Sequence, residues 1–368
     1  MPISTESDAA VDNGVYLDWN ATAPMRPAAI EAMMAAAERW ANPASVHAPG
    51  RAASGTLETA RETIADVIGV DPRQIIFTGG GTEAATLAMR GVARDRHIVS
   101  AVEHAAVRDA VRDREILPVD DDGIVRLGAL EAMLTGAPAI VGVMHANNET
   151  GVIQPLSDAR ELIRRAGGLL FADAVQTAGK LDLPEADFVG ISAHKLGGPP
   201  GVGALIAFDE QNLRAIQPGG GQEGGLRGGT QNLPGIAGFA AAAAALDRDW
   251  MPAARTRQRR LEERLIAAGG AIYGAGATRL PNTTLVGMPG VPATTQLMAF
   301  DLDGIAVSAG AACSSGKVEA SHVLLAMGVD EIAAGEAIRV STGWSTTDRD
   351  VERFASSWET LRRRRRAA

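Results

Sequence analysis

Short apolar runs and amphipathic segments alternate through the first 210 or so residues of the chain. The apolar runs predict strands at residues 16–18, 74–78, 97–101, 139–144, 169–172, 188–191 and 201–208. Helices are predicted between them. A clear example is 51–68, where Leu57, Ile64 and Ile68 recur at helical spacing. This alternation is typical of an α/β fold with a doubly wound, mostly parallel sheet of about seven strands flanked by helices.

The pattern changes from about residue 250. A charged helix over 255–268 precedes a short strand near 283–286, a loop at 308–316, a helix over 321–327 and a strand over 337–341. This order predicts a smaller α+β domain. We therefore expect a large domain of residues 15–250 and a small C-terminal domain of residues 251–368 that also includes residues 1–14.

Polar residues gather where several predicted strands end. His104 follows the strand over 97–101, the stretch 145–151 follows another, and Asp173 to Gln176 follow a third. In doubly wound sheets, ligands bind in the crevice outside the carboxyl ends of the strands. The sequence therefore predicts a ligand site at that edge.

The stretch TGGGTEA at residues 78–84 predicts an anion site. The strand over 74–78 meets a turn of three glycines, and a helix is expected to open at Thr82. Free backbone N–H groups and the helix dipole converge at such a point. The stretch lacks the Gly-Lys-Ser/Thr of a Walker loop, so it indicates a phosphate only weakly, and a plain helix cap is the alternative.

Lys195 lies in ISAHKLGGPPGVGAL, residues 191–205, between a predicted strand and a glycine-rich turn. Its amine would point into a crevice, where a desolvated lysine loses its proton easily and can form a Schiff base with a carbonyl. Ser192 and His194 offer hydrogen-bond donors suited to a phosphate. A surface lysine before a loop is the alternative.

Composition narrows the class of protein. The 368 residues carry 35 Lys and Arg against 44 Asp and Glu, a net charge of −9 that gives no indication of a nucleic-acid partner. Cys313 is the single cysteine, so no internal disulfide can form and a reducing compartment is expected. The polar first residues do not resemble a signal peptide, and no apolar run reaches the roughly 18 residues of a membrane span. We expect a cytoplasmic protein that does not enter membranes.

Asp173, Lys195 and the glycine turn together suit pyridoxal 5'-phosphate. This cofactor needs a lysine for a Schiff base, a carboxylate that keeps its pyridine nitrogen protonated, and a cradle for its phosphate. With these three features in order along one sheet, we predict a pyridoxal-phosphate enzyme.

Ten motifs then resemble the cysteine desulfurases of the NifS/IscS type, in the class V aminotransferase superfamily of fold-type I. They run in the same order from about residue 15 to 355. The motifs are YLDWNAT (16–22), TGGGTEA (78–84), VEHAAV (102–107), MHANNETGVIQP (144–155), FADAVQTAGK (171–180), SAHKLGGPPGVGAL (192–205), GGGQEGGLRGGT (219–230), SAGAACSSG (308–316), SHVLLAMG (321–328) and IRVSTG (338–343).

The resemblance implies roles around the cofactor ring. Lys195 would bind the cofactor and later move the proton of the substrate Cα. Asp173 would pair with the pyridine nitrogen, and Gln176 would hydrogen-bond the ring phenolate oxygen. His104 would stack on the ring and serve as an acid or base toward the substrate thiol.

The resemblance also implies a phosphate site and a homodimer. The phosphate ligands would be Gly81, Thr82, Ser192 and His194. Thr230 would reach the phosphate bound by the other subunit.

For the substrate, L-cysteine, the resemblance implies two carboxylate contacts, Asn148 and Arg339, the latter as a bidentate fork. Cys313 lies among small residues in a loop of the first subgroup of these enzymes. It would take the sulfur atom as a persulfide and release L-alanine. The sulfur would pass to an acceptor protein, either an iron–sulfur scaffold or a thiolation protein.

Some residues depart from the family pattern and bear on cross-subunit contacts and on acceptor choice. Arginine and serine are usual where Gly224 and Gly228 stand, and arginine is usual in place of Trp344. The other departures are Trp19, Gly197 and Pro200.

Two other functions stay open. One is another fold-type I pyridoxal-phosphate enzyme, such as a selenocysteine lyase, a cysteine lyase or an aminotransferase. The other is a non-enzymatic dimeric homologue. The tail Arg362–Arg366 is either a solvated helix end or a patch for an acidic partner.

Overall fold

The computed structural model describes residues 14–310 and 320–367. Its strands are β1 (Val15–Tyr16), β2 (Ile75–Thr78), β3 (Arg96–Ser100), β4 (Glu115–Leu117), β5 (Ala139–Gly142), β6 (Leu169–Asp173), β7 (Phe188–Ser192), β8 (Gly203–Ala207), β9 (Ala271–Ile272), β10 (Thr283–Gly287), β11 (Ile305–Ala306), β12 (Ser308–Ala309) and β13 (Ala337–Ser341).

Its α-helices are α1 (Pro27–Ala37), α2 (Ala48–Ile68), α3 (Gly81–Gly91), α4 (Ala105–Arg108), α5 (Leu127–Met133), α6 (Leu156–Arg165), α7 (Leu233–Ala244), α8 (Met251–Ala267), α9 (Ala293–Leu302), α10 (His322–Ala326), α11 (Glu331–Ala334) and α12 (Asp348–Ala367). Short 3₁₀ turns include η2 (Ala193–Lys195) and η4 (Gln222–Gly225).

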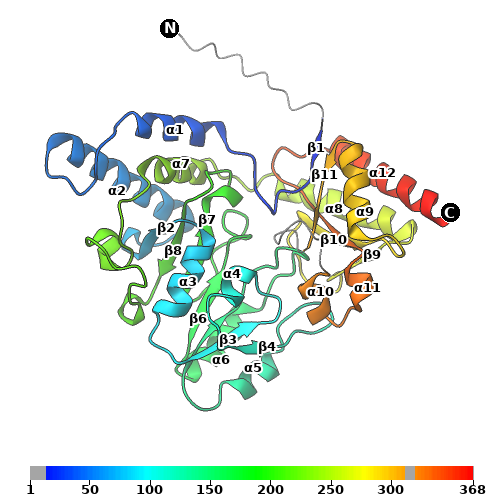
Figure 1. Ribbon diagram of the computed structural model, residues 1–368, viewed down its shortest axis with the longest axis horizontal. Helices are drawn as coiled ribbons and strands as arrows, with labels where there is room; N and C mark the ends of the chain where they lie inside the picture. Colours follow the sequence, from blue (N-terminus) through cyan, green and yellow to red (C-terminus); the bar gives the residue numbers. More distant parts are fainter. Residues whose placement is uncertain (1–13, 311–319, 368) are drawn as a thin grey trace, which may run out of the picture.

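A seven-stranded sheet in the order β2-β8-β7-β6-β5-β3-β4 forms the larger part of the fold (Figure 1). β8 runs antiparallel to both of its neighbours, and the other pairs are parallel. The carboxyl ends of β3, β5, β6 and β7 therefore meet at one edge. This confirms the predicted α/β class and its mostly parallel sheet.

Helices cover both faces of this sheet, because successive strand side chains point to opposite sides. In β2, Ile75 and Phe77 pack into a core shared with α2, α5, α6 and α7, whereas Ile76 packs into a core shared with α3 and α4. The two apolar layers leave only the ends of the strands open to ligands.

A second, four-stranded sheet in the order β12-β13-β10-β9 lies in the C-terminal part (Figure 1). Its core contains residues from α8, α9 and α12, and also Val15 and Leu17 from the start of the described chain. β1 pairs in parallel with β11, joining Val15 to Ile305. The predicted domain boundary after residue 250 stays a prediction.

The predicted elements differ from the observed ones mainly at their ends. The strand expected at 16–18 is β1, one residue earlier, and Asp18 forms an isolated bridge to Ser341. The helix expected from 255 begins at Met251 because a proline occupies its first turn. β4 was not predicted, since its three residues are mostly exposed and show no clear pattern. Within the described ranges, no helix combines the length and hydrophobicity needed to cross a bilayer.

Candidate active site

Lys195 lies at the carboxyl edge of the large sheet, where β7 passes directly into the turn η2. Its Nζ donates hydrogen bonds to the backbone oxygens of Asn20, at 2.5 Å, and Ala21, at 2.7 Å. The side chain is half-buried, and its amine is held against the loop that follows β1.

The loop that receives Lys195 is fixed between the two sheets. The Asn20 side chain is buried and donates to the backbone oxygen of Asn148, at 3.1 Å, and to Thr283 Oγ1, at 2.9 Å. Sequence reasoning did not find Asn20 or Ala21. Both residues lie in the motif YLDWNAT, but every residue has a backbone carbonyl, so the residue type does not indicate this acceptor role.

Asp173 is the last residue of β6, one strand away from Lys195 in the sheet. Its Oδ1 accepts the N–H of Val175 at 2.9 Å. Burial raises the pKa of the Asp173 carboxyl, while that hydrogen bond and the nearby His104 and Lys195 oppose the rise. A cation placed against this carboxylate would keep it ionised.

His104 caps the N-terminus of α4, and its Nδ1 accepts the N–H of Ala106 at 3.1 Å. Since Nδ1 is the acceptor, the proton of the neutral ring lies on Nε2. Burial lowers the pKa of His104, and the positive charge of Lys195 adds to this effect while Asp173 opposes it. The ring is therefore neutral at pH 7 and presents an Nε2–H donor.

Gln176 shares an acceptor with the lysine: its Nε2 donates to the backbone oxygen of Asn20 at 3.0 Å, the same atom that accepts from Lys195. Its Oε1 is buried without a hydrogen-bond partner among the described residues. A buried polar atom without a partner costs free energy, so a site here for a polar ligand group is physically reasonable.

The glycine turn before α3 forms a close cradle. Gly80 has φ +143° in a region that favours glycine, and a Cβ on Gly81 would lie 2.7 Å from Val175 Cγ2. Ser192 is buried beside it, with its Oγ 3.8 Å from the place a Gly80 Cβ would occupy. Thr82, in the first turn of α3, is exposed.

His194 lies next to this cradle, with Nδ1 3.2 Å from Thr22 Oγ1. Burial lowers the pKa of His194 to about 4, with a further contribution from Lys195. At neutral pH it is therefore an uncharged partner. A helix N-terminus, a hydroxyl and an uncharged imidazole are suited to a phosphate group.

These residues fit pyridoxal 5'-phosphate. They supply a lysine amine, a buried carboxylate and a glycine cradle along one sheet edge. In the described ranges, no cluster of three or more His, Cys, Asp or Glu side chains is arranged to hold a metal ion.

Arg339 comes from β13 of the second sheet and reaches the same region. Its Nη1 donates to the backbone oxygen of Asn148 at 3.0 Å, and its Nη2 to Asp18 Oδ1 at 2.7 Å. The side chain is buried, and its Nε has no partner in the described part of the chain. The structure thus brings together Asn148 and Arg339, which the sequence had paired, and adds Asp18, which it had not.

Thr230 and Cys313 are not joined to this cluster. Thr230 is exposed and makes no hydrogen bond within the described residues, although Arg227, three positions earlier, binds Glu83 of α3 at 2.7 Å. Cys313 lies outside the described residues. The described residues on either side of that segment both contact Glu149: Ser321 Oγ donates to its Oε2 at 2.5 Å, and a Cβ on Gly310 would meet the same atom at 2.1 Å.

Three further ionisable residues near the site were not found by sequence reasoning, although all lie within quoted motifs. Burial and the nearby Asp173 raise the pKa of Glu103 well above its usual value, and burial raises that of Glu149. Burial, together with the positive charge of Lys195, lowers the pKa of Lys180 to about 7. Its Nζ donates to the Gln176 backbone oxygen at 2.8 Å. Burial, which decides all three pKa values, is not visible in the sequence.

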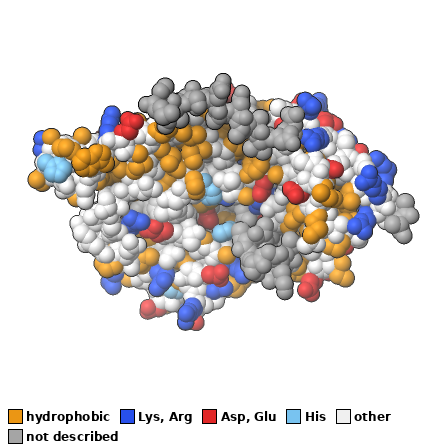
Figure 2. All heavy atoms as spheres, turned by 45° about the horizontal axis from the view of Figure 1, so that its top comes forward, with side chains coloured by type: hydrophobic (Ala, Val, Ile, Leu, Met, Phe, Trp, Pro, Cys, Tyr) orange, Lys and Arg blue, Asp and Glu red, His pale blue; other side chains and the backbone are white. Residues whose placement is uncertain are grey.

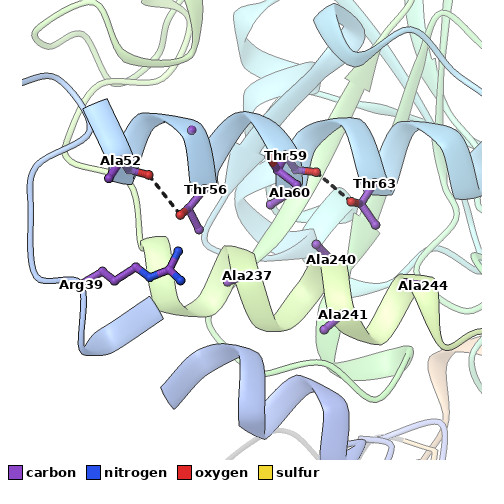
Figure 3. A pocket seen from close by; sticks show the side chains of 11 residues that line it. Arg39, Ala52, Thr56, Thr59, Ala60, Thr63, Ala237, Ala240, Ala241 and Ala244 are labelled. Carbon is purple, nitrogen blue, oxygen red and sulfur yellow. Dashed lines mark hydrogen bonds between the residues drawn. The ribbon is translucent and has the colours of Figure 1, made fainter. Parts of the chain in front are cut away.

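A separate cavity of about 480 Å³ lies between α2 and α7 (Figure 3). Arg39 is its one charged lining residue, and the other side chains are alanine and threonine apart from Gly55. It lacks the acid and base groups gathered at the strand ends, so the chemistry belongs to the sheet edge.

Comparison with known proteins agrees with this geometry. The family model described as aminotransferase class-V matches residues 15–354. The chain is 40% identical to a cysteine desulfurase of Cereibacter sphaeroides, with 92% of this chain and 93% of the relative covered. It is 38% identical to the IscS-like cysteine desulfurase of Mycobacterium tuberculosis, covering 92% and 93%.

Among solved structures, the NifS-like protein from Rickettsia africae superposes with a TM-score of 0.88 at 32% identity, covering 95% of this chain and 99% of that one. The family match spans both sheets, and the relatives are covered almost from end to end. The chain therefore belongs to the aminotransferase class-V family and, within it, to the cysteine desulfurases.

Proposed function

We propose that this protein is a pyridoxal-phosphate-dependent cysteine desulfurase that converts L-cysteine to L-alanine and takes the sulfur atom onto Cys313. The observation that carries the proposal is the grouping of Lys195, Asp173 and Arg339 about one loop and one sheet edge. Homologues at about 40% identity bear the name cysteine desulfurase.

When bound, pyridoxal 5'-phosphate supplies an electron sink that stabilises negative charge at the substrate Cα. Asp173 pairs with the pyridine nitrogen, and Lys195 holds and moves the Cα proton. The carbonyls of Asn20 and Ala21 support this role, because they accept hydrogen bonds from the Lys195 amine and would stabilise it once it has taken up the proton. Gly81, Thr82, Ser192 and His194 would hold the phosphate. Gln176 would bind the ring oxygen through its amide N–H, because that oxygen is an acceptor.

His104 acts at the substrate thiol as a donor. With Nδ1 accepting a backbone N–H, the neutral ring presents its Nε2–H as a hydrogen-bond donor to the sulfur. Arg339 and Asn148 hold the substrate carboxylate. The unpartnered Nε of Arg339 supports this assignment, because a bidentate carboxylate could use it.

Sulfur transfer is a displacement at the substrate sulfur. The Cys313 thiolate attacks that atom, an S–S bond forms, and the bond from sulfur to Cβ breaks. The electron pair goes to the alanine carbon skeleton, which then takes up a proton. The persulfide next passes to an acceptor, for which an iron–sulfur scaffold or a thiolation protein is our proposal.

The same proposal includes a homodimer, in which Thr230 reaches the partner's phosphate. Large hydrophobic side chains are exposed along α1 and the loop after it: Met34 at 63%, Trp40 at 88% and Val46 at 88%. Figure 2 shows hydrophobic side chains gathered over the region where α1 lies in Figure 1. Exposed apolar patches of this kind mark protein interfaces. A cytoplasmic location stays a prediction.

One cuvette experiment tests the function. The purified protein is given pyridoxal 5'-phosphate, its visible spectrum is recorded, and L-cysteine is added with dithiothreitol. We expect a visible band that changes on addition, formation of alanine, and a mass increase of one sulfur atom on Cys313. Cys313→Ala should keep the band and lose sulfide release, whereas Lys195→Ala should lose the normal band.

Other results would redirect the assignment. A visible band without alanine indicates another pyridoxal-phosphate reaction, and an amino acid made from an added keto acid indicates an aminotransferase. Absence of any band indicates a non-enzymatic homologue. Unchanged sulfide release by Cys313→Ala contradicts the role of that thiol.

A further inference from the structure

Three departures from the desulfurase pattern meet at one place, although they lie far apart in the sequence. The rings of Trp19 and Trp344 form an edge-to-face pair with centroids 4.6 Å apart and an interplanar angle of 77°. Gly197, with φ +84°, lies against the pair, and a Cβ there would be 2.8 Å from Trp344 Cη2. The backbone at Gly343 is closer still to the other ring, since a Cβ there would lie 2.0 Å from Trp19.

Arg26 completes this group. Its guanidinium carbon lies 3.9 Å from the centroid of the Trp344 ring, on the ring face, which is the geometry of a cation–π contact. The family pattern places an arginine where Trp344 stands. Here residue 344 is an aromatic ring, and the Arg26 guanidinium lies on its face.

The group borders the segment that contains Lys195. Arg26 donates from its backbone N–H to the Gly197 oxygen, at 2.8 Å, and from Nε to the Leu196 oxygen, at 3.1 Å. Ala23 donates to the His194 oxygen at 2.9 Å. The segment 20–26 therefore runs beside the segment 194–197. Trp344 packs against both of them from a third segment, 343–344.

We propose that Trp19, Arg26 and Trp344 form a positioning unit that holds the carbonyls of Asn20 and Ala21 at hydrogen-bond distance from the Lys195 amine. These three residues position Lys195 without touching the reacting atoms. The inference rests on the proposed role of Lys195.

The physical reason is that a carbonyl acceptor acts only at short range. Hydrogen bonds weaken steeply once the donor and acceptor separate or tilt. The residues 20–26 form no regular element of the large sheet, so their position depends on contacts made from outside. Loosening the stack would change how Lys195 is held when its amine is not bound to the cofactor, and hence its proton affinity and its rate of proton transfer.

A charge swap tests the unit. In Trp344→Arg, two guanidinium groups face each other and should repel. Arg26→Asp places a carboxylate against the aromatic ring and removes the cation. In the double variant, Arg26→Asp with Trp344→Arg, opposite charges face each other and should restore the contact. Residues in contact show non-additive effects of this kind, whereas independent residues do not.

Two readouts are taken: the pH midpoint of the rate at which the visible band forms when pyridoxal 5'-phosphate is added to the cofactor-free protein, which reports the proton on the free Lys195 amine, and kcat and KM of the holoenzyme for L-cysteine. We expect each single variant to shift the midpoint and lower kcat about tenfold with a smaller change in KM, and the double variant to recover to within about threefold. Leu302→Arg, at a side chain 88% exposed on α9, adds a guanidinium elsewhere and should change neither readout.

Additive effects in the double variant would overturn the unit. So would single variants that lower only the melting temperature while the pH midpoint and kcat stay unchanged. If the unaltered protein makes no alanine from L-cysteine, the proposed function fails before the variants are compared. The two failures are thus distinguishable.

Discussion

At the scale of single residues, the site depends on atoms shared between neighbours. The Asn20 backbone oxygen accepts from both Lys195 and Gln176, and the Asn148 backbone oxygen accepts from both Asn20 and Arg339. A change at one side chain therefore alters the partners of another. This coupling favours kinetic tests that separate binding from chemistry.

Arg339→Ala tests the carboxylate contact. The variant removes a buried guanidinium and leaves Asp18 without its partner. Truncation of one member of a buried charge pair typically costs about 2–5 kcal/mol. We expect KM for L-cysteine to rise on the order of 100-fold, measured by alanine formation.

Arg73→Ala is the matched control, because Arg73 forms an exposed ion pair with Asp71 that is distant from the strand-end side chains in the sheet topology. Its KM should equal that of the unaltered protein. An unchanged KM in Arg339→Ala would remove Arg339 from the substrate site. Arg339→Lys should restore binding only in part, since an ammonium cannot form the two-pronged contact.

At the scale of elements, α2 shows how local sequence and tertiary contact divide the control of one helix. His47 caps its N-terminus by accepting the Gly50 N–H at 3.2 Å, and Gly69, at φ +76°, ends it in the left-handed conformation. The amphipathic spacing predicted this helix within three residues. The same pattern does not show at which glycine of the helix the packing excludes a larger side chain.

Two glycine-to-alanine changes within α2 should have opposite effects. At Gly55 a Cβ would meet nothing within 4 Å, so Gly55→Ala should stabilise the protein by about 0.5–1 kcal/mol through the higher helix propensity of alanine. At Gly50 a Cβ would lie 2.2 Å from the Ser45 backbone oxygen, so Gly50→Ala should destabilise it. Urea denaturation of both variants measures the difference, and equal effects would contradict the packing described.

At the scale of the whole molecule, stability depends on keeping buried histidines uncharged. His145 follows β5 with its Nδ1 2.9 Å from Thr177 Oγ1, and burial lowers its pKa to about 4. Burial has the same effect on His194. In the unfolded chain both would titrate near 6.5.

At these two histidines, the unfolded state therefore binds more protons than the folded state between pH 6.5 and 4. Their contribution to the free energy of unfolding should be greatest above pH 6.5 and fall as the pH is lowered through this range. We expect His145→Asn to reduce the loss between pH 7 and pH 5 by on the order of 1 kcal/mol. Urea denaturation of the two proteins at each pH measures it, and an equal loss in both would show that His145 is not involved.

Several side chains of the candidate site could be predicted from the sequence, because their residue types suit the chemistry of pyridoxal 5'-phosphate. Lys195, Asp173 and His104 follow predicted strands, and parallel strands bring their ends to one edge. The acceptors of the lysine could not be predicted, since any residue offers a carbonyl. The sequence also did not single out Asp18, Glu103 and Glu149. Only their burial and their neighbours in the structure distinguish them from other carboxylates.

The sequence by itself determined the α/β class, the order of the main strands and the residue types of the site, because hydrophobic periodicity and side-chain chemistry are local properties. Only the tertiary structure decided that Arg339 of the second sheet meets Asp18 in the loop after β1, and that Trp19, Arg26 and Trp344 form one group. These contacts join residues up to 325 positions apart. Their distances follow from packing of both sheets around a shared loop, which no local pattern encodes.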